Sequence, residues 1–176
     1  MAGRARGRRH RGRAQRPDDG GRVHGPGQGP GRSGGLAVTG PRRKIPVAAC
    51  SGIGKSLGAA AREAACILTE DLRPERTKLI ALSLLVMGDD DARGEIAGRQ
   101  AIAIDGCKLE CAAKGLAGAG ATNVHKIAVF DVIRRHRGLK PEGVCDLNED
   151  GLKLARAAAE EAAGIVDDID KEADHA

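Results

Sequence analysis

Short apolar runs alternate with Ala-rich amphipathic stretches along residues 44–172, which predicts strands that alternate with helices. The apolar runs expected to form strands are 45–50, 77–86, 102–104 and 124–131. The stretches expected to form helices are 57–72, 92–98, 108–117 and 148–169. Strands joined through helices pair in parallel. The sequence therefore predicts an α/β protein, a three-layer α/β/α sandwich with a mostly parallel sheet of about four strands.

Residues 1–43 show no such alternation. They are rich in Gly, Arg and Pro and hold almost no apolar side chains, so we expect a disordered basic tail before the 44–172 domain. Three interpretations of this tail remain open. It is an arm that binds RNA weakly through phosphate contacts, a tail without function, or an upstream stretch read from a start codon assigned too early.

Charge and composition exclude several classes of function. Residues 1–44 hold twelve Lys and Arg against two Asp, whereas the rest of the chain holds 17 basic and 22 acidic residues. The expected domain is therefore mildly acidic, and we expect nucleic-acid contact only through the tail. With no secretory segment and no apolar run that could span a bilayer, the chain is expected to be cytoplasmic, away from membranes, with its five cysteines reduced.

Three of these cysteines follow predicted strands. Cys50 ends the first strand, Cys107 follows Asp105 at the end of the third, and Cys111 lies four positions further on. The carboxyl ends of parallel strands meet at one edge of a sheet, so we expect these thiols to converge there. Cys107 and Cys111 are expected on one face of the 108–117 helix at its N-terminus, where the helix dipole favours the thiolate.

A set of three thiolates is typical of a metal site. Soft sulfur ligands favour Zn²⁺ and, less often, an iron–sulfur cluster, so we predict zinc bound by Cys50, Cys107 and Cys111, with a cluster or no metal as alternatives. Cys66, within the first helix, is expected to act as a small core hydrophobe. Cys145 reaches the site only if its loop folds back. A metal ion is the one partner that the sequence indicates, and no protein partner is indicated.

From residue 45 to about residue 163 the chain resembles the DGC family, which is named for the motif found here as Asp105-Gly106-Cys107. Cys50, with the Ser and Gly that follow it, and Cys111 match the same family, and residues 82–89 and 139–143 resemble its longer members. The resemblance implies zinc held by four chelating cysteines, with no reaction assigned. The family's remaining cysteine belongs in the second strand, where this chain has Ala81 near the expected position. This difference implies either a three-thiolate site open to water or a ligand, or a site without tight metal binding.

The same region offers an alternative, in which a P-loop-like segment binds a nucleotide or a phosphate. Residues 49–56 have the spacing of a Walker A loop, with Ala49 in place of the first glycine, between a predicted strand and helix. Backbone N–H groups at the start of a helix can hold an anion, and Asp105 could then stand in for the acidic residue that holds Mg²⁺. The candidate residues of this loop are Ser51, Gly52, Gly54, Lys55 and Ser56.

A third alternative uses the thiols without a permanent metal. Cys107 and Cys111 could carry sulfur or cycle through a disulfide. Their spacing is one residue longer than the redox C-x-x-C motif, which ranks this alternative below metal binding. The sequence favours neither an enzymatic nor a non-enzymatic role and indicates no substrate or oligomeric state.

Overall fold

The computed structural model describes residues 43–52 and 54–175. The predicted disordered tail falls, apart from Arg43, outside the described residues. The helices and strands, in chain order, are β1 (Ile45–Ala49), α1 (Ser56–Cys66), a π-helical turn η1 (Ile67–Leu72), β2 (Thr77–Leu79), α2 (Leu82–Met87), α3 (Asp90–Gly94), β3 (Gln100–Asp105), α4 (Cys111–Gly118), β4 (Asn123–Ala128), α5 (Val129–Arg135) and α6 (Glu149–Asp174).

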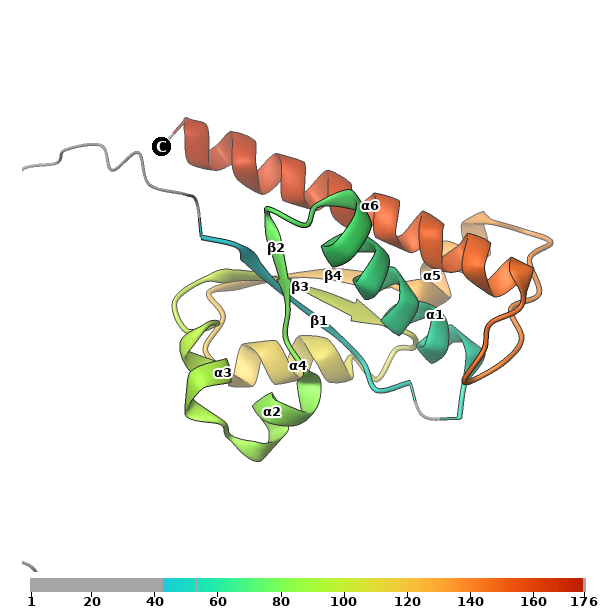
Figure 1. Ribbon diagram of the computed structural model, residues 1–176, viewed down its shortest axis with the longest axis horizontal. Coiled ribbons are helices and arrows are strands. Elements are labelled where there is room, and N and C mark those ends of the chain that lie inside the picture. Colours follow the sequence, from blue (N-terminus) through green and yellow to red (C-terminus); the bar gives the residue numbers. More distant parts are fainter. Residues whose placement is uncertain (1–42, 53, 176) are drawn as a thin grey trace, which may run out of the picture. The chain divides into compact units, whose positions relative to one another are not determined.

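The four strands form one parallel sheet in the order β2-β1-β3-β4, which confirms the predicted fold class. Val47 in the central strand pairs with Leu79 on one side and Ile102 on the other. Figure 1 shows α1 and α6 side by side on one face of the sheet, with α2, α3 and α4 on the other. Both faces are therefore covered, which explains why β1 and β3 are apolar almost throughout.

The second predicted strand, 77–86, was wrong over most of its length. Only Thr77–Leu79 is a strand, and Leu82–Met87 is the helix α2. A short apolar run cannot be assigned by periodicity alone, and Leu and Met are good helix formers. Gly88, with a φ of +81°, ends α2, and the Asp89 side chain accepts the Ala92 N–H at the start of α3.

Other predicted boundaries also differ from the structure. The strand expected at 124–131 ends at Ala128, because Val129 and Val132 enter the core three positions apart on the helix α5. The helix expected at 108–117 begins only at Cys111, after Glu110 takes a φ of +54°. The C-terminal helix α6 is longer than expected and buries an Ala-rich face against α1.

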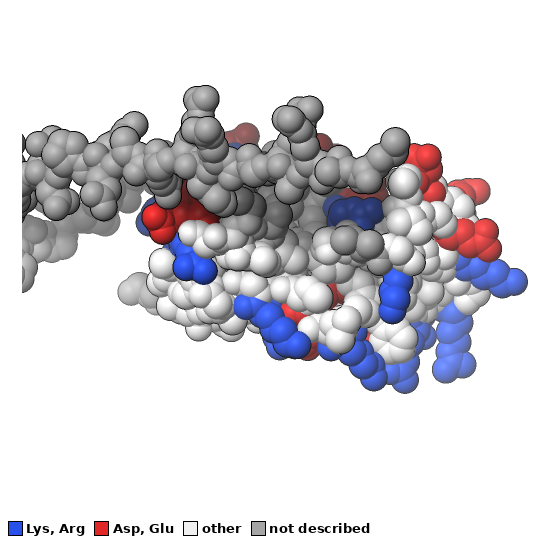
Figure 2. All heavy atoms as spheres, turned by 90° about the horizontal axis from the view of Figure 1, so that it is seen from below, with Lys and Arg blue, Asp and Glu red and all other residues white. Residues whose placement is uncertain are grey.

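α2, α3 and α4 cover the side of the sheet from which Figure 2 is viewed. Figure 2 shows this face with Lys and Arg side chains gathered toward its border. α2 contributes exposed apolar side chains to it, namely Leu84, Val86 and Met87. No described helix has the length and apolar character needed to cross a membrane.

Candidate functional site

A pocket of about 760 Å³, which we call the cysteine pocket, opens where β1 and β3 end. Cys50, Cys107 and Cys111, the three predicted metal ligands, all line it. Two segments that are far apart in the sequence deliver them, because β1 and β3 are adjacent parallel strands. The other residues of the lining are Ser51, Gly52, Lys55, Leu57, Gly58, Asp105, Gly106, Lys108, Leu109 and Phe130.

Cys50 lies deepest in the fold of these three cysteines. Its backbone N–H donates to the carbonyl of Ile104 at 3.0 Å, and its side chain is only 7% exposed. Burial raises the pKa of the Cys50 thiol, and the charges of Asp105 and Cys107 act in the same direction. The Gly106 N–H, 3.2 Å from Sγ, opposes this rise only in part. At this position burial outweighs the backbone N–H donors, so the protonated thiol is favoured over the thiolate.

Three glycines from three segments meet beneath the pocket. A Cβ added to Gly58, in the first turn of α1, would lie 2.2 Å from the Cα of Gly52, and a Cβ added to Gly106 would lie 2.7 Å from the Cα of Gly58. The loop after β1 and the turn after β3 therefore both rest on the backbone of α1. This contact, which we call the glycine junction, places Cys50 and Cys107 on the same pocket.

The glycine junction includes one residue that the sequence interpretation missed. Gly58 lies in an otherwise Ala-rich helix, where a glycine costs stability relative to alanine. That cost was the available signal that another segment approaches closely at this position. The residues that make the approach, Gly52 and Gly106, could be identified only from the fold.

Asp105 is 4% exposed and holds the start of α4. Its two carboxylate oxygens accept the N–H groups of Ala112 and Ala113 at 2.9 and 3.1 Å. These are backbone donors of the first helical turn, which have no partner within the helix. Both oxygens are thus used inside the fold, which weighs against the Mg²⁺ role considered for Asp105.

Cys107 and Cys111 do not lie on one helix, contrary to the prediction. Cys107 belongs to a turn in which its carbonyl accepts the Glu110 N–H at 3.3 Å, and Cys111 is the first residue of α4. Glu110 separates them with left-handed backbone geometry. Both thiols nevertheless line the pocket. Across the described residues, no three His, Cys, Asp or Glu side chains are already grouped so as to hold a metal ion.

The candidate phosphate loop contributes to the same pocket. Ser51, Gly52 and Lys55 line it, whereas Gly54 and Ser56 are not part of its lining. The Lys55 N–H donates to the Gly52 carbonyl at 3.3 Å, so this donor is used within the loop. The part of the loop that faces the pocket is therefore the lysine and the segment beside Cys50.

The remaining cysteines lie outside the pocket. Cys66 is half-buried at the end of α1, and burial is the main cause that raises its pKa. Cys145 is exposed, but its loop does fold back: the Arg62 guanidinium donates to the carbonyls of Ser51 and Val144, the neighbours of Cys50 and Cys145. Ala81, near which the resemblance implied a further cysteine, is exposed and lines a separate hollow.

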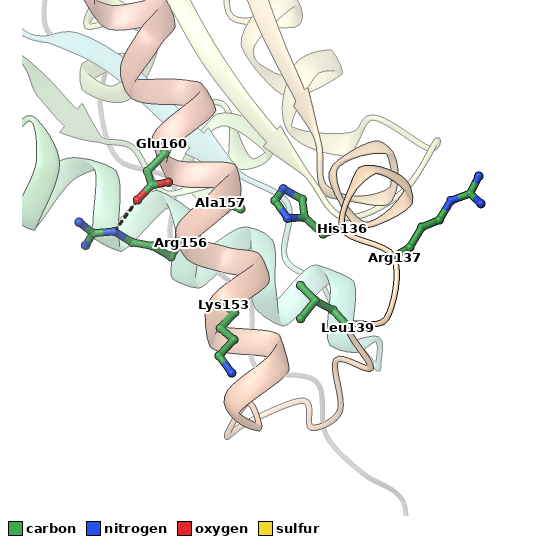
Figure 3. Close-up of a pocket in the computed structure, with 7 residues that line it drawn as sticks. All are labelled: His136, Arg137, Leu139, Lys153, Arg156, Ala157 and Glu160. Atoms are coloured by element: carbon green, nitrogen blue, oxygen red, sulfur yellow. Dashed lines mark hydrogen bonds and ion pairs between the residues drawn. The ribbon is translucent and has the colours of Figure 1, made fainter.

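A further hollow lies between the end of α5 and α6. Figure 3 shows that Arg137 points away from it and that Arg156 is turned to Glu160, with 3.1 Å between Nε and Oε1. Lys153, which also lines it, pairs with Glu149 at 2.7 Å. Its basic side chains therefore do not converge on a common point, and the cysteine pocket is the stronger candidate site.

Comparison with known families agrees with this choice of region. The model of the DGC domain matches residues 46–150, which is more than half of the 176 residues. The chain belongs to the DGC domain family. All residues that line the cysteine pocket lie within the matched DGC domain. Neither the curated proteins nor the solved structures compared with the sequence gave a match.

The three residues of the DGC motif have separate roles in this domain. Asp105 accepts two N–H groups at the start of α4, Gly106 packs on Gly58, and Cys107 lines the pocket. The motif thus combines one helix anchor, one close backbone contact and one thiol. The first two fix the backbone that carries the third.

Proposed function

We propose that this DGC domain binds a zinc ion through the thiolates of Cys50, Cys107 and Cys111. The observation that carries the proposal is that these cysteines, supplied by two distant segments, line one pocket at the carboxyl edge of the sheet. Thiolates are the ligands of most structural zinc sites and of several catalytic ones. Packing alone would not require three thiols at one edge.

The three thiolates are ligands that zinc prefers in proteins. The turn from Cys107 to Glu110 is outside regular secondary structure, so zinc binding needs to draw together the side chains of Cys107 and Cys111 rather than whole elements. With three protein ligands, the fourth position of a tetrahedral site is left for water or another ligand, where a bound zinc would supply Lewis-acid chemistry. Because burial favours the protonated Cys50 thiol, zinc affinity should rise with pH as the ion displaces this proton.

The test is the metal content of reduced, freshly purified protein. We expect stoichiometric zinc in the wild-type chain and its loss in Cys107→Ser. Cys66→Ser is the matched control, since Cys66 lies outside the pocket, and it should keep its zinc. Equal zinc in Cys107→Ser and wild type would overturn the proposal, and iron with acid-labile sulfide would replace it by a cluster site.

Whether Cys145 is a fourth ligand decides whether the proposed zinc site has a free coordination position. Its loop is tied by Arg62 to the loop that follows Cys50, but Cys145 itself is outside the pocket lining. We therefore expect Cys145→Ser to retain zinc. Loss of zinc in this variant would mean a closed site of four thiolates, in which no position is left for a further ligand.

The phosphate-binding and thiol-redox alternatives concern the same pocket, and each of them has a measurement of its own. A metal-free protein that binds ATP with Mg²⁺, and loses this binding in Lys55→Ala, would favour the phosphate loop. A disulfide between Cys107 and Cys111 that forms and opens reversibly with a glutathione buffer would favour thiol redox chemistry. Zinc content that depends on Cys107 but not on Lys55 separates the main proposal from both.

A further inference from the structure

The cysteine pocket is much larger than a metal ion requires. Its volume of about 760 Å³ falls within the range of pockets that hold small organic molecules, about 300–1,000 Å³. Zinc bound to the three thiols would leave most of this space vacant. The question is therefore which kind of molecule the rest of the pocket suits.

The walls beyond the thiols are apolar. Leu57, Leu109 and Phe130 line the pocket from α1, from the turn before α4 and from α5. Leu109 is 65% exposed, although nothing in the core requires a large apolar side chain in this turn. Phe130 is the single aromatic residue of the chain, and it faces this pocket. An apolar group bound here would cover both side chains from water.

The charged side chains around these walls are mostly basic. Lys55 and Lys108 line the pocket, and Lys108 Nζ lies 5.4 Å from the centre of the Phe130 ring. The Arg134 guanidinium lies 6.0 Å from the same ring. No carboxylate of the described residues forms an ion pair with Lys55 or Lys108 in the structure.

Among the described residues of the lining, Asp105 is the single acidic one, and both of its oxygens are bonded to the start of α4. Three thiolates exceed the charge of one Zn²⁺, and the two lysines of the lining offset this excess. An anion can therefore enter the pocket with zinc in place as well as without it. Attraction to two lysines at a mostly apolar wall is stronger than the same attraction in open solvent.

We propose that the cysteine pocket binds a small organic anion, with its acidic group between Lys55 and Lys108 and its apolar body over Leu57, Leu109 and Phe130. The inference deepens the proposed function, since it names the class of molecule that the open zinc position would meet. It requires both a charge and an apolar part in the ligand. Neither inorganic anions nor uncharged apolar molecules satisfy both halves of the pocket.

The test uses hexanoate as the probe and ligand-observed NMR titration of the full chain as the measurement. Acetate has the same acidic group without the apolar body, and 1-hexanol has the apolar body without the charge. We expect saturable binding of hexanoate that is at least tenfold tighter than that of either comparison molecule. Equal binding of acetate, equal binding of 1-hexanol, or no binding of hexanoate would each overturn the inference.

Variants locate the binding within the pocket. Lys108→Met keeps the length of the side chain and removes its charge, and we expect it to weaken hexanoate about fivefold, as for one partly exposed ion pair. Lys140→Met is the matched control, because Lys140 is exposed and lies outside the pocket. Equal affinity in the wild type and Lys108→Met would overturn the assignment of the anion to this lysine.

The titration is made on protein as purified and again after chelation, beside a measurement of its zinc. Hexanoate bound by protein that never held zinc would support the anion pocket and contradict the zinc proposal. Zinc lost in Cys107→Ser without any hexanoate binding would do the reverse. The two proposals can therefore fail separately.

Discussion

The two edges of the sheet are held by different kinds of interaction. At the amino edge, before β2, Arg73 binds Asp167 of α6 through Nε and Nη2 at 2.8 and 2.6 Å. Arg76 makes a similar two-bond contact with Asp170, one turn further along α6. These pairs lie at the surface and are partly exposed. Because water screens these partly exposed pairs, each of them contributes only modestly to stability.

The carboxyl edge relies instead on close backbone contact. The glycine junction leaves no room for a Cβ, and Asp105 holds α4 through two buried hydrogen bonds. Such contacts fix positions closely because any added atom must displace backbone. The difference indicates that the amino edge serves mainly to close the fold, whereas the carboxyl edge fixes the positions of thiols. Substitutions at the two edges should therefore differ both in size and in kind.

The largest effect is expected for Gly58→Ala. The new methyl group would lie 2.2 Å from the Cα of Gly52, so one of the two segments must move, at a cost of about 3 kcal/mol in unfolding free energy. Zinc content should fall with it, since the loop that carries Cys50 is displaced. Urea denaturation measures the change in unfolding free energy, and metal analysis measures the change in zinc content.

Gly164→Ala is the control for Gly58→Ala. Gly164 is an exposed position within α6 where a Cβ meets nothing within 4 Å. This substitution should stabilise the protein by about 0.5–1 kcal/mol, as alanine does in helices. Similar stabilities for the two variants would show that the glycine junction is not under steric constraint.

An intermediate effect is expected for Asp105→Asn. The amide has one acceptor oxygen in place of two, so one N–H of Ala112 or Ala113 loses its partner, at a cost of about 1–3 kcal/mol. The pKa of the Cys50 thiol should fall at the same time, because the Asp105 charge contributes to raising it. Denaturation measures the first change, and the pH dependence of Cys50 alkylation measures the second. A rise in this pKa would contradict the charge interaction.

The smallest effect is expected at the amino edge, for Asp167→Asn. The Arg73 side chain, mainly through its hydrogen bonds, holds the pKa of the Asp167 carboxyl below its usual range. Its stabilising contribution is therefore present above the pKa of the unfolded carboxyl, about 3.9, and is lost as the pH falls through the lower pKa of the folded state. Because the pair is partly exposed, the loss at pH 7 should not exceed about 1 kcal/mol.

Denaturation of Asp167→Asn at pH 7 and at pH 3 tests this expectation. The difference from wild type should shrink at the lower pH, and zinc content at pH 7 should be unchanged. A loss of zinc in Asp167→Asn would mean that the amino edge also fixes the site, which would remove the contrast between the two edges.

Local sequence determined the class of fold and the edge at which the thiols gather. The apolar runs of β1 and β3 and the helices between them indicate a parallel sheet, and Cys50, Asp105 and Cys107 lie at the carboxyl ends of those strands. The strand predicted at 77–86 failed because its leucines suit a helix equally well, and only packing against α4 decides between them. The start of the helix predicted at 108–117 was wrong for a similar reason. Nothing in the sequence indicates that Glu110 takes left-handed backbone geometry, so that the helix begins only at Cys111.

Tertiary structure alone decided how the thiols are held. A glycine in the sequence indicates either an unusual backbone conformation or close approach by another segment. The partners that approach Gly58 come from segments on either side of it, which are far from each other along the chain. The raised pKa of the Cys50 thiol likewise depends on what buries it, which the sequence around Cys50 does not show. Periodicity records which residues face the core, because that requirement is local, whereas steric contact and burial depend on neighbours that only the completed fold supplies.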